Sequence, residues 1–218
     1  MIGRILPAQV ASADAFDDSD EAKLFPEEEA IVARAVDSRR LAFATARVCA
    51  RRAMAQLGIP PVAIGRIGDS APRWPTGVVG SITHCDGYRG AAVAWAREIA
   101  SVGIDAEPNA PLPPGVLRTV ASADEQGRIA ALAAAGRAVS WDRLLFSAKE
   151  STYKAWFPLM HEWLGFEDAQ VTIDPAAGTF ESHLLVPGPT VAGRRLQRFT
   201  GGWHIDGNLV ATAIALPA

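Results

Sequence analysis

The chain contains 218 residues, of which 49% are hydrophobic and 21% charged, and its formal net charge is −3. This composition excludes an intrinsically disordered protein, and the negative charge argues against a general nucleic-acid-binding protein. No apolar run approaches the length of a membrane-spanning helix, and Pro7 with the acidic residues that follow it does not fit a secretory signal. We therefore expect a cytoplasmic protein that binds neither nucleic acid nor membranes, with Cys49 and Cys85 as free thiols.

The first half of the sequence predicts helices followed by strands. Pro26 and the three glutamates after it are typical of a helix start, and Gly58 is typical of a helix end. Asp37 is a candidate N-cap in the middle, so one long helix and two consecutive helices both remain open. The predicted elements of this half are a helical region at 27–57, a Gly- and Pro-rich loop at 65–80, and strands at 90–96 and 99–105.

The second half repeats this order of helices and then strands. Pro158 predicts the end of the last helix, and Asp206-Gly207 predicts a hairpin turn. The layout predicts an α+β fold of two similar-sized halves, residues 1–104 and 105–218, although no sequence repeat indicates a duplication. The predicted elements are a loop at 108–115, helices at 123–138 and 141–157, and strands at 169–174, 179–186, 194–199 and 203–216.

A strand that ends in two carboxylates is the first candidate for chemistry. Asp105 and Glu107 are two residues apart in the apolar segment 101–108, so their side chains point to the same face. Neighbouring carboxylates repel each other unless a cation or a proton lies between them, and hard oxygen ligands suit Mg²⁺ shared with a phosphate. The alternative is a solvated strand end with two surface acids, because Asp-x-Glu is a common sequence.

The second candidate is a helical segment that carries two of the three lysines of this arginine-rich chain. Residues 146–156 read Phe-Ser-Ala-Lys-Glu-Ser-Thr-Tyr-Lys-Ala-Trp, and Lys149 and Lys154 are the two lysines. A retained lysine indicates a position that needs a compact point charge. Glu150 and Lys154 are four residues apart and share one face of the helix. Alone, the pair is equally consistent with an exposed ion pair worth ~0.3–0.5 kcal/mol.

The third candidate is the segment Gly-Ser-Ile-Thr-His at 80–84. Glycine allows a ligand to approach the backbone, the hydroxyls of Ser81 and Thr83 can bind phosphate oxygens, and His84 can donate to an anion. The alternative is a structural histidine beside an apolar stretch. The other three histidines are scattered along the chain and receive no functional role: His161, His183 and His204.

Taken in this order, the three segments resemble the signature of the Sfp-type (EntD-like) 4′-phosphopantetheinyl transferases. That family carries a Gly-Ser-x-Ser/Thr-His element, a Val-Gly-Ile-Asp-x-Glu strand and a Phe/Trp-Ser/Ala/Cys-x-Lys-Glu-Ser/Ala-x-x-Lys helix. They are matched here by residues 80–84, 102–107 and 146–154. The resemblance covers most of the chain and looks closest to the actinobacterial type II enzymes. It implies a monomer with the fold of this family, in which two pseudo-symmetric halves each contain an antiparallel sheet packed with helices.

The resemblance also implies a catalytic site. It assigns Asp105, Glu107 and Glu150 to a Mg²⁺ ion, with Mn²⁺ as an alternative, that is shared with the pyrophosphate of coenzyme A. Lys154 would bind the phosphate under attack and Lys149 the pyrophosphate. The attacking group would be a serine hydroxyl of an apo acyl or peptidyl carrier protein. Glu150 or a water molecule would accept its proton, and 3′,5′-ADP would leave.

Other residues would bind the rest of coenzyme A. The family places Arg39, Arg47 and His84 at the 3′-phosphate and Arg66 near the adenine. Helix periodicity alone groups Arg47 with Arg40 and Arg51 instead, so both arginine sets remain open. The resemblance places three aromatic side chains along the pantetheine arm and two arginines, beside the loop at 108–121, towards the carrier protein: Phe146, Tyr153 and Trp163, and Arg118 and Arg128.

Two other functions fit parts of the sequence. Ser151-Thr152-Tyr153-Lys154 is a literal Ser-x-x-Lys, the nucleophile motif of one class of serine hydrolases, but the Ser-Asp-Asn and Lys-Thr-Gly motifs of that class do not occur. A non-catalytic protein that binds carrier domains is the second alternative. The presence of the three acids and Lys154 argues against it.

Overall fold

The computed structural model describes residues 1–19, 21–67, 71–136 and 138–218. Its elements in chain order are η1 (Ile2–Ile5), β1 (Ala11–Ala15), α1 (Pro26–Val32), α2 (Asp37–Gln56), β2 (Gly65–Ile67), β3 (Ala71–Arg73), β4 (Val78–Cys85), β5 (Tyr88–Trp95), β6 (Ile99–Pro108), α3 (Val116–Val120), α4 (Ala123–Ala134), α5 (Trp141–Met160), η2 (Phe166–Asp168), β7 (Ala169–Asp174), β8 (Thr179–Leu184), β9 (Thr190–Val191), β10 (Arg194–Arg195), β11 (Arg198–Asp206) and β12 (Leu209–Pro217).

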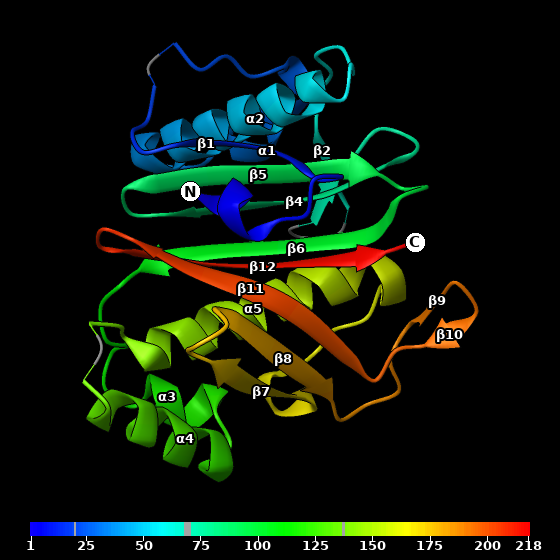
Figure 1. The fold of residues 1–218 in the computed structure, drawn as a ribbon. Helices are drawn as coiled ribbons and strands as arrows, with labels where there is room; N and C mark the ends of the chain where they lie inside the picture. The colour runs from blue at the N-terminus through cyan, green and yellow to red at the C-terminus, as the bar shows by residue number, and fades with distance from the viewer. Residues whose placement is uncertain (20, 68–70, 137) are drawn as a thin grey trace.

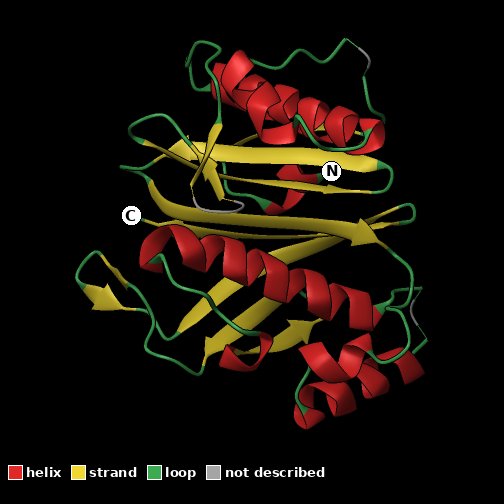
Figure 2. Ribbon diagram, turned by 180° about the vertical axis from the view of Figure 1, so that it is seen from behind, coloured by secondary structure: helices red, strands yellow, loops and turns green. Residues whose placement is uncertain are grey.

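Two antiparallel sheets form the body of the molecule (Figure 1). The smaller sheet has the strand order β1-β5-β4 and the larger one the order β6-β12-β11-β8-β7. Helix α2 covers the small sheet and helix α5 packs on the large one, as the view from behind also shows (Figure 2). The predicted α+β fold of two halves, each an antiparallel sheet packed with helices, is confirmed. The predicted boundary after residue 104 falls inside β6, whose whole length pairs with β12 in the large sheet.

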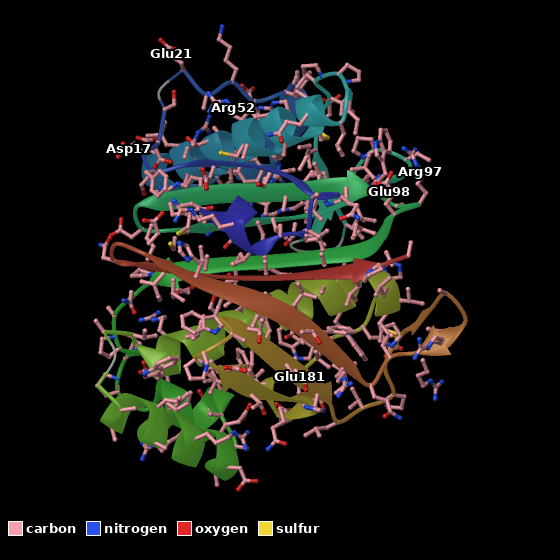
Figure 3. The ribbon with its side chains drawn as sticks, in the orientation of Figure 1. Asp17, Glu21, Arg52, Arg97, Glu98 and Glu181 are labelled. Carbon is pink, nitrogen blue, oxygen red and sulfur yellow. The ribbon has the colours of Figure 1, made fainter. Side chains whose placement is uncertain are left out.

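The helical region at 27–57 forms two helices, α1 and α2, which resolves the alternative that the sequence left open. Small side chains on one face of α2 pack against β1 and β5, and Ala50 and Ala53 are fully buried there. Arg52 of the same helix is exposed to solvent (Figure 3). No helix in the described ranges combines the length and the hydropathy needed to cross a bilayer.

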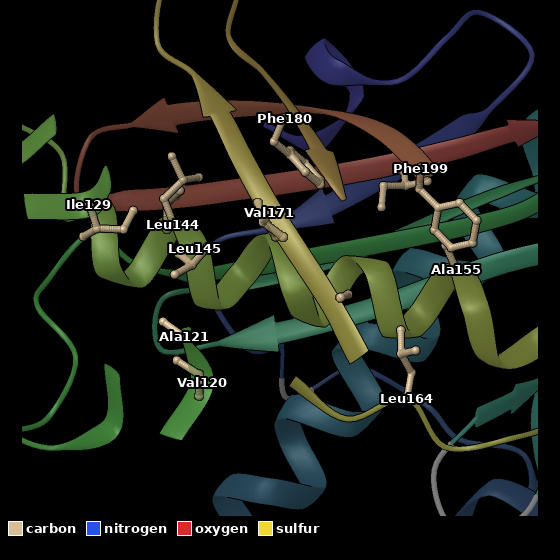
Figure 4. Packing of buried hydrophobic residues seen from close by; sticks show 14 of the residues in the cluster. Val120, Ala121, Ile129, Leu144, Leu145, Ala155, Leu164, Val171, Phe180 and Phe199 are labelled. Atoms are coloured by element: carbon tan, nitrogen blue, oxygen red, sulfur yellow. The ribbon is translucent and has the colours of Figure 1, made fainter. Parts of the chain in front are cut away.

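Helix α5 lies against the core of the larger half. Leu144 and Leu145 pack among Ile129, Val171 and Phe180, which come from α4, β7 and β8 (Figure 4). The predicted end of this helix before Pro158 is wrong, since α5 continues to Met160. A proline in the last turn removes only one helical hydrogen bond, so the helix can continue for a few residues more.

Strands in the first half were the weakest part of the prediction. The region expected as a loop at 65–80 contains the hairpin of β2 and β3 and the start of β4, and the first strand, β1, was not predicted. β1 reads Ala-Ser-Ala-Asp-Ala, without a β-branched or aromatic residue, so it has little intrinsic strand preference. It forms because β5 offers it a paired edge along residues 11–15.

Gly103 explains how closely α5 approaches β6. A Cβ atom at this position would overlap the carbonyl oxygen of Ser151 and lie 2.6 Å from the backbone nitrogen of Ala155. We expect Gly103→Ala to lower the free energy of unfolding by about 1–3 kcal/mol, because the helix or the strand must move to make room. Urea unfolding followed by circular dichroism measures this effect.

Gly127 of α4 provides a matched control. A Cβ atom there would have no neighbour within 4 Å, so Gly127→Ala should raise the free energy of unfolding by about 0.5–1 kcal/mol. Equal stability of Gly103→Ala and the parent would contradict the close packing of α5 on β6.

Candidate active site

The two sheets meet where β4 lies beside β6, and side-chain hydroxyls connect these two edge strands. The backbone N–H of Ile104 donates to Ser81 Oγ at 3.2 Å, and that of Ala106 donates to Thr83 Oγ1 at 3.1 Å. Both hydroxyl residues are buried. The two hydroxyls accept these backbone N–H groups along what we call the β4–β6 seam (residues 81–83 and 104–106), and Ser81 also lines the cleft described below.

Asp105 lies at this seam and faces α5. Its Oδ1 accepts hydrogen bonds from Lys154 Nζ at 2.7 Å and from Thr83 Oγ1 at 3.2 Å. Its Oδ2 is buried and has no hydrogen-bond partner among the residues that the structure describes. A buried carboxylate oxygen without a hydrogen-bond donor destabilises the folded protein, so a bound ligand is the expected partner of this atom.

Glu107 pairs with a residue that the sequence did not single out. Arg143 Nη1 donates to Glu107 Oε2 at 2.9 Å, and the same guanidinium donates to the carbonyl oxygens of Ala110 and Pro111, each at 3.1 Å. Arg143 thereby holds the loop that follows β6. The sequence could have indicated Arg143 as a site residue. It lies seven residues before Glu150, which is two helical turns, and so on the same face of the helix.

Glu150 and Lys154 extend from α5 towards Asp105. Burial raises the pKa of Glu150, the charge of Asp105 raises it further, and Lys154 acts in the opposite direction. Burial likewise raises the pKa of Glu107, with Asp105 adding to the effect and Arg143 opposing it. Asp105 is thus within electrostatic reach of both glutamates.

The three carboxylates do not form a closed metal site here. No group of three His, Cys, Asp or Glu side chains in the described part of the chain is arranged to hold a metal ion. Two of the acids are instead paired with basic side chains, Asp105 with Lys154 and Glu107 with Arg143. The free Oδ2 of Asp105 and the raised pKa of Glu150 nevertheless suit a hard divalent cation.

Lys149 is buried and directed away from Lys154. Its ammonium group donates to Glu125 Oε2 at 3.0 Å and to the carbonyl oxygens of Phe166 and Ala169 at 2.7 and 2.8 Å. All three of its protons are used, so none remains for a pyrophosphate. The reason is helical geometry, because residues five apart, such as Lys149 and Lys154, lie on different faces.

A cleft of about 460 Å³ lies between the halves, next to these acids. Trp74, Val78 and Ile82 line it from the smaller half, and Tyr153 and Phe157 line it from α5, where Glu150 and Lys154 also reach it. Most of this lining is apolar. Two of the three aromatics expected along the pantetheine arm are near the cleft, since Tyr153 packs against Trp163 with ring centroids 4.9 Å apart. Phe146 packs instead against Phe166.

The early arginines divide into two groups. Arg47 Nε donates to the carbonyl of Ile64 at 3.2 Å and lies 4.0 Å from Glu28, while Arg51 binds Glu28 at 2.9 Å. Burial lowers the pKa of Arg47 to about 10, and the charges of Arg66 and Arg51 add to this effect. Arg47 and Arg51 therefore share the fully buried carboxylate of Glu28, in agreement with helix periodicity.

Arg39 belongs to a different cationic group. Its side chain is exposed at the start of α2. The pKa of His84 is lowered, mainly because the side chain is desolvated. The nearby charges of Lys154, Arg89 and Arg39 lower it further. The structure thus brings Arg39 and His84 to the same side of the molecule as Lys154.

Comparison with known proteins identifies the family of this chain. Residues 27–94 match the family model of the 4′-phosphopantetheinyl transferase N-terminal domain, and residues 101–205 match that of the 4′-phosphopantetheinyl transferase superfamily. The 4′-phosphopantetheinyl transferase Svp of Streptomyces mobaraensis is 55% identical over 100% of this chain and 90% of its own length. The chain belongs to the 4′-phosphopantetheinyl transferase family. Npt of Nocardia iowensis is 51% identical over 99% of both chains, and PptT of Mycobacterium tuberculosis is 45% identical over 99% of this chain and 98% of its own.

Membership of the 4′-phosphopantetheinyl transferase family confirms the resemblance inferred from the three motifs. It also decides against the serine hydrolase, and the structure agrees. Ser151 is fully buried, and its hydroxyl donates to the carbonyl of Ala148 within α5 at 3.0 Å. A nucleophilic serine must reach its substrate, so this one has no such role.

Proposed function

We propose that this transferase moves 4′-phosphopantetheine from coenzyme A to a serine of apo acyl and peptidyl carrier proteins, in the cleft between its halves. The observation that carries the proposal is the set of Asp105, Glu150 and Lys154 beside this cleft, with one oxygen of Asp105 left without a donor. In the reaction a bond forms between the serine oxygen and the phosphorus atom, and the phosphorus–oxygen bond to 3′,5′-ADP breaks.

Lys154 and Glu150 act directly on the reacting groups in this proposal, and Glu150 is also one of the three acids of the metal site. Lys154 offers a point charge to the phosphate under attack, and Glu150, whose raised pKa makes it a suitable base, accepts the proton of the serine hydroxyl. Asp105, Glu107 and Glu150 would hold Mg²⁺ or Mn²⁺. The ion, when bound, would stabilise the charge that develops on the pyrophosphate oxygens.

The cationic group at Arg39 and His84 would bind the 3′-phosphate of coenzyme A. We expect Arg39→Gln to weaken binding of coenzyme A by about 10- to 100-fold, because a charged hydrogen bond is worth about 1.5–3 kcal/mol. Binding of 3′-dephospho-coenzyme A should stay the same. Isothermal titration calorimetry with both nucleotides measures the difference.

Arg40→Gln is the control, since Arg40 is the next residue of α2 and is less exposed than Arg39. If Arg40→Gln lost the preference for the 3′-phosphate and Arg39→Gln kept it, the arginine set from helix periodicity would replace the one proposed here. Arg47 and Arg66 would add positive charge near the bound 3′-phosphate without a direct contact. The guanidinium of Arg47 is buried against Glu28 and Ile64.

The carrier protein would approach the loop after β6, beside Arg118. Arg118 is exposed near the end of α3, whereas Arg128 donates to the backbone carbonyl of Val171 at 3.3 Å and is less available. An acidic carrier surface would meet Arg118 there. We propose that the enzyme acts as a monomer.

One assay tests the function as a whole. The enzyme is incubated with coenzyme A, Mg²⁺ and an apo carrier protein, and the carrier should gain ~340 Da, the mass of the phosphopantetheine moiety. EDTA should abolish the gain. A carrier of unchanged mass would contradict the transfer, and a gain that survives EDTA would contradict the role of the metal.

A further inference from the structure

Among the residues that the structure describes, the hydroxyl of Thr83 has two hydrogen-bond partners. It accepts from the backbone N–H of Ala106 at 3.1 Å and donates to Asp105 Oδ1 at 3.2 Å. Thr83 is only 2% exposed. Because a hydroxyl has a single proton and the bond from Ala106 fixes the oxygen, the proton is directed at the carboxylate.

Two donors therefore converge on the same oxygen of Asp105. Lys154 Nζ reaches Oδ1 at 2.7 Å, so Oδ1 has both hydrogen bonds and Oδ2 has none within the described residues. If the carboxylate group could rotate freely, the two hydrogen-bond donors would be distributed over both of its oxygens. This unequal arrangement fixes the carboxylate and leaves Oδ2 for a ligand that needs a bare oxygen, such as a divalent cation.

We infer that Thr83 is a positioning residue, which holds Asp105 with Oδ2 directed to the metal, and that it is not a ligand of coenzyme A. The inference rests on the proposed metal-dependent transfer. Neighbours that hydrogen-bond to a metal ligand in this way fix its orientation and raise its affinity for the ion.

Ser81 offers a matched comparison within the same strand. Its hydroxyl accepts from the N–H of Ile104 at 3.2 Å, as Thr83 accepts from Ala106, but it makes no hydrogen bond to a carboxylate in the described part of the chain. The two residues thus make the same bond across the β4–β6 seam, and only Thr83 adds a bond to Asp105. A variant at Ser81 loses only the bond across the seam, whereas a variant at Thr83 loses that bond and the bond to Asp105. Comparing the two variants separates the two effects.

The experiment measures the affinity for Mn²⁺, by electron paramagnetic resonance with saturating coenzyme A, in Thr83→Val, Thr83→Ser and Ser81→Ala. Thr83→Val should weaken Mn²⁺ binding by about 10- to 100-fold, as losses of such supporting bonds do. Thr83→Ser should restore the parent affinity, and Ser81→Ala should keep it. Thr83→Ala replaces the valine variant if the latter does not fold.

A second measurement separates this role from a contact with coenzyme A. In EDTA, Thr83→Val should bind coenzyme A as the parent does. Unchanged Mn²⁺ affinity in Thr83→Val, or weaker coenzyme A binding in EDTA, would overturn the inference while leaving the transferase intact. Loss of Mn²⁺ affinity in Ser81→Ala equal to that in Thr83→Val would overturn it too. If the parent enzyme transferred phosphopantetheine in EDTA, the proposed metal dependence would be wrong. The inference on Thr83, which rests on it, would then be wrong as well.

Discussion

Glu150→Gln is expected to slow the transfer of phosphopantetheine by about 10²- to 10⁴-fold, the usual contribution of a general acid or base. Glutamine has nearly the same shape and hydrogen-bonding reach but accepts no proton at neutral pH and is a weaker ligand for a hard cation. The fold should persist, because Glu150 lies at the edge of the cleft and forms no ion pair with any residue that the structure describes. Single-turnover transfer to an apo carrier, followed by mass spectrometry, measures the rate.

Glu181→Gln is the control for this experiment. Glu181 lies on β8 on the face of the sheet turned away from α5 (Figure 3), where it pairs with His183 and Arg198. The Glu181→Gln enzyme should transfer phosphopantetheine at the rate of the parent enzyme. A Glu150→Gln enzyme as fast as Glu181→Gln would show that Glu150 is neither the base nor a necessary metal ligand, and the mechanism proposed above would be wrong.

Lys149→Met should lower the free energy of unfolding by about 3–5 kcal/mol, the effect of breaking a buried ion pair from one side. The Lys149 and Glu125 side chains are 3% and 1% exposed. Glu125 also accepts from the backbone N–H groups of Ser122 and Val171, at 2.8 and 2.7 Å, so the pair ties α4, α5 and β7 together. Urea unfolding at neutral pH gives the value.

Two further variants sharpen this measurement. Lys23→Met removes an exposed lysine and should leave the stability of the protein unchanged. The double variant Glu125→Gln with Lys149→Met should recover part of the lost stability, because the unpaired charge is gone. If Lys149→Met instead unfolded like the parent and raised the KM for coenzyme A, Lys149 would contact the pyrophosphate after all.

Local periodicity in the sequence determined which residues share a face. The strand spacing of Asp105 and Glu107 and the helix spacing of Glu150 and Lys154 follow from the pleat and from the helical turn. These relations need no knowledge of the rest of the chain. For the same reason the sequence predicted the approximate positions of α4, α5, β7 and β8, although not every helix end, and it identified the family from three short segments.

Tertiary structure alone decided which partner each face meets. Nothing local distinguishes a hydroxyl that binds phosphate from one that accepts a backbone N–H across a seam, and Thr83 does the latter. Likewise, Lys149 lies next to Glu150 in sequence but turns to Glu125, and Glu107 finds Arg143. Such contacts join residues far apart in the chain. They depend on how the sheets and helices pack, because a buried charge or hydroxyl must bond with whatever partner the packing brings to it.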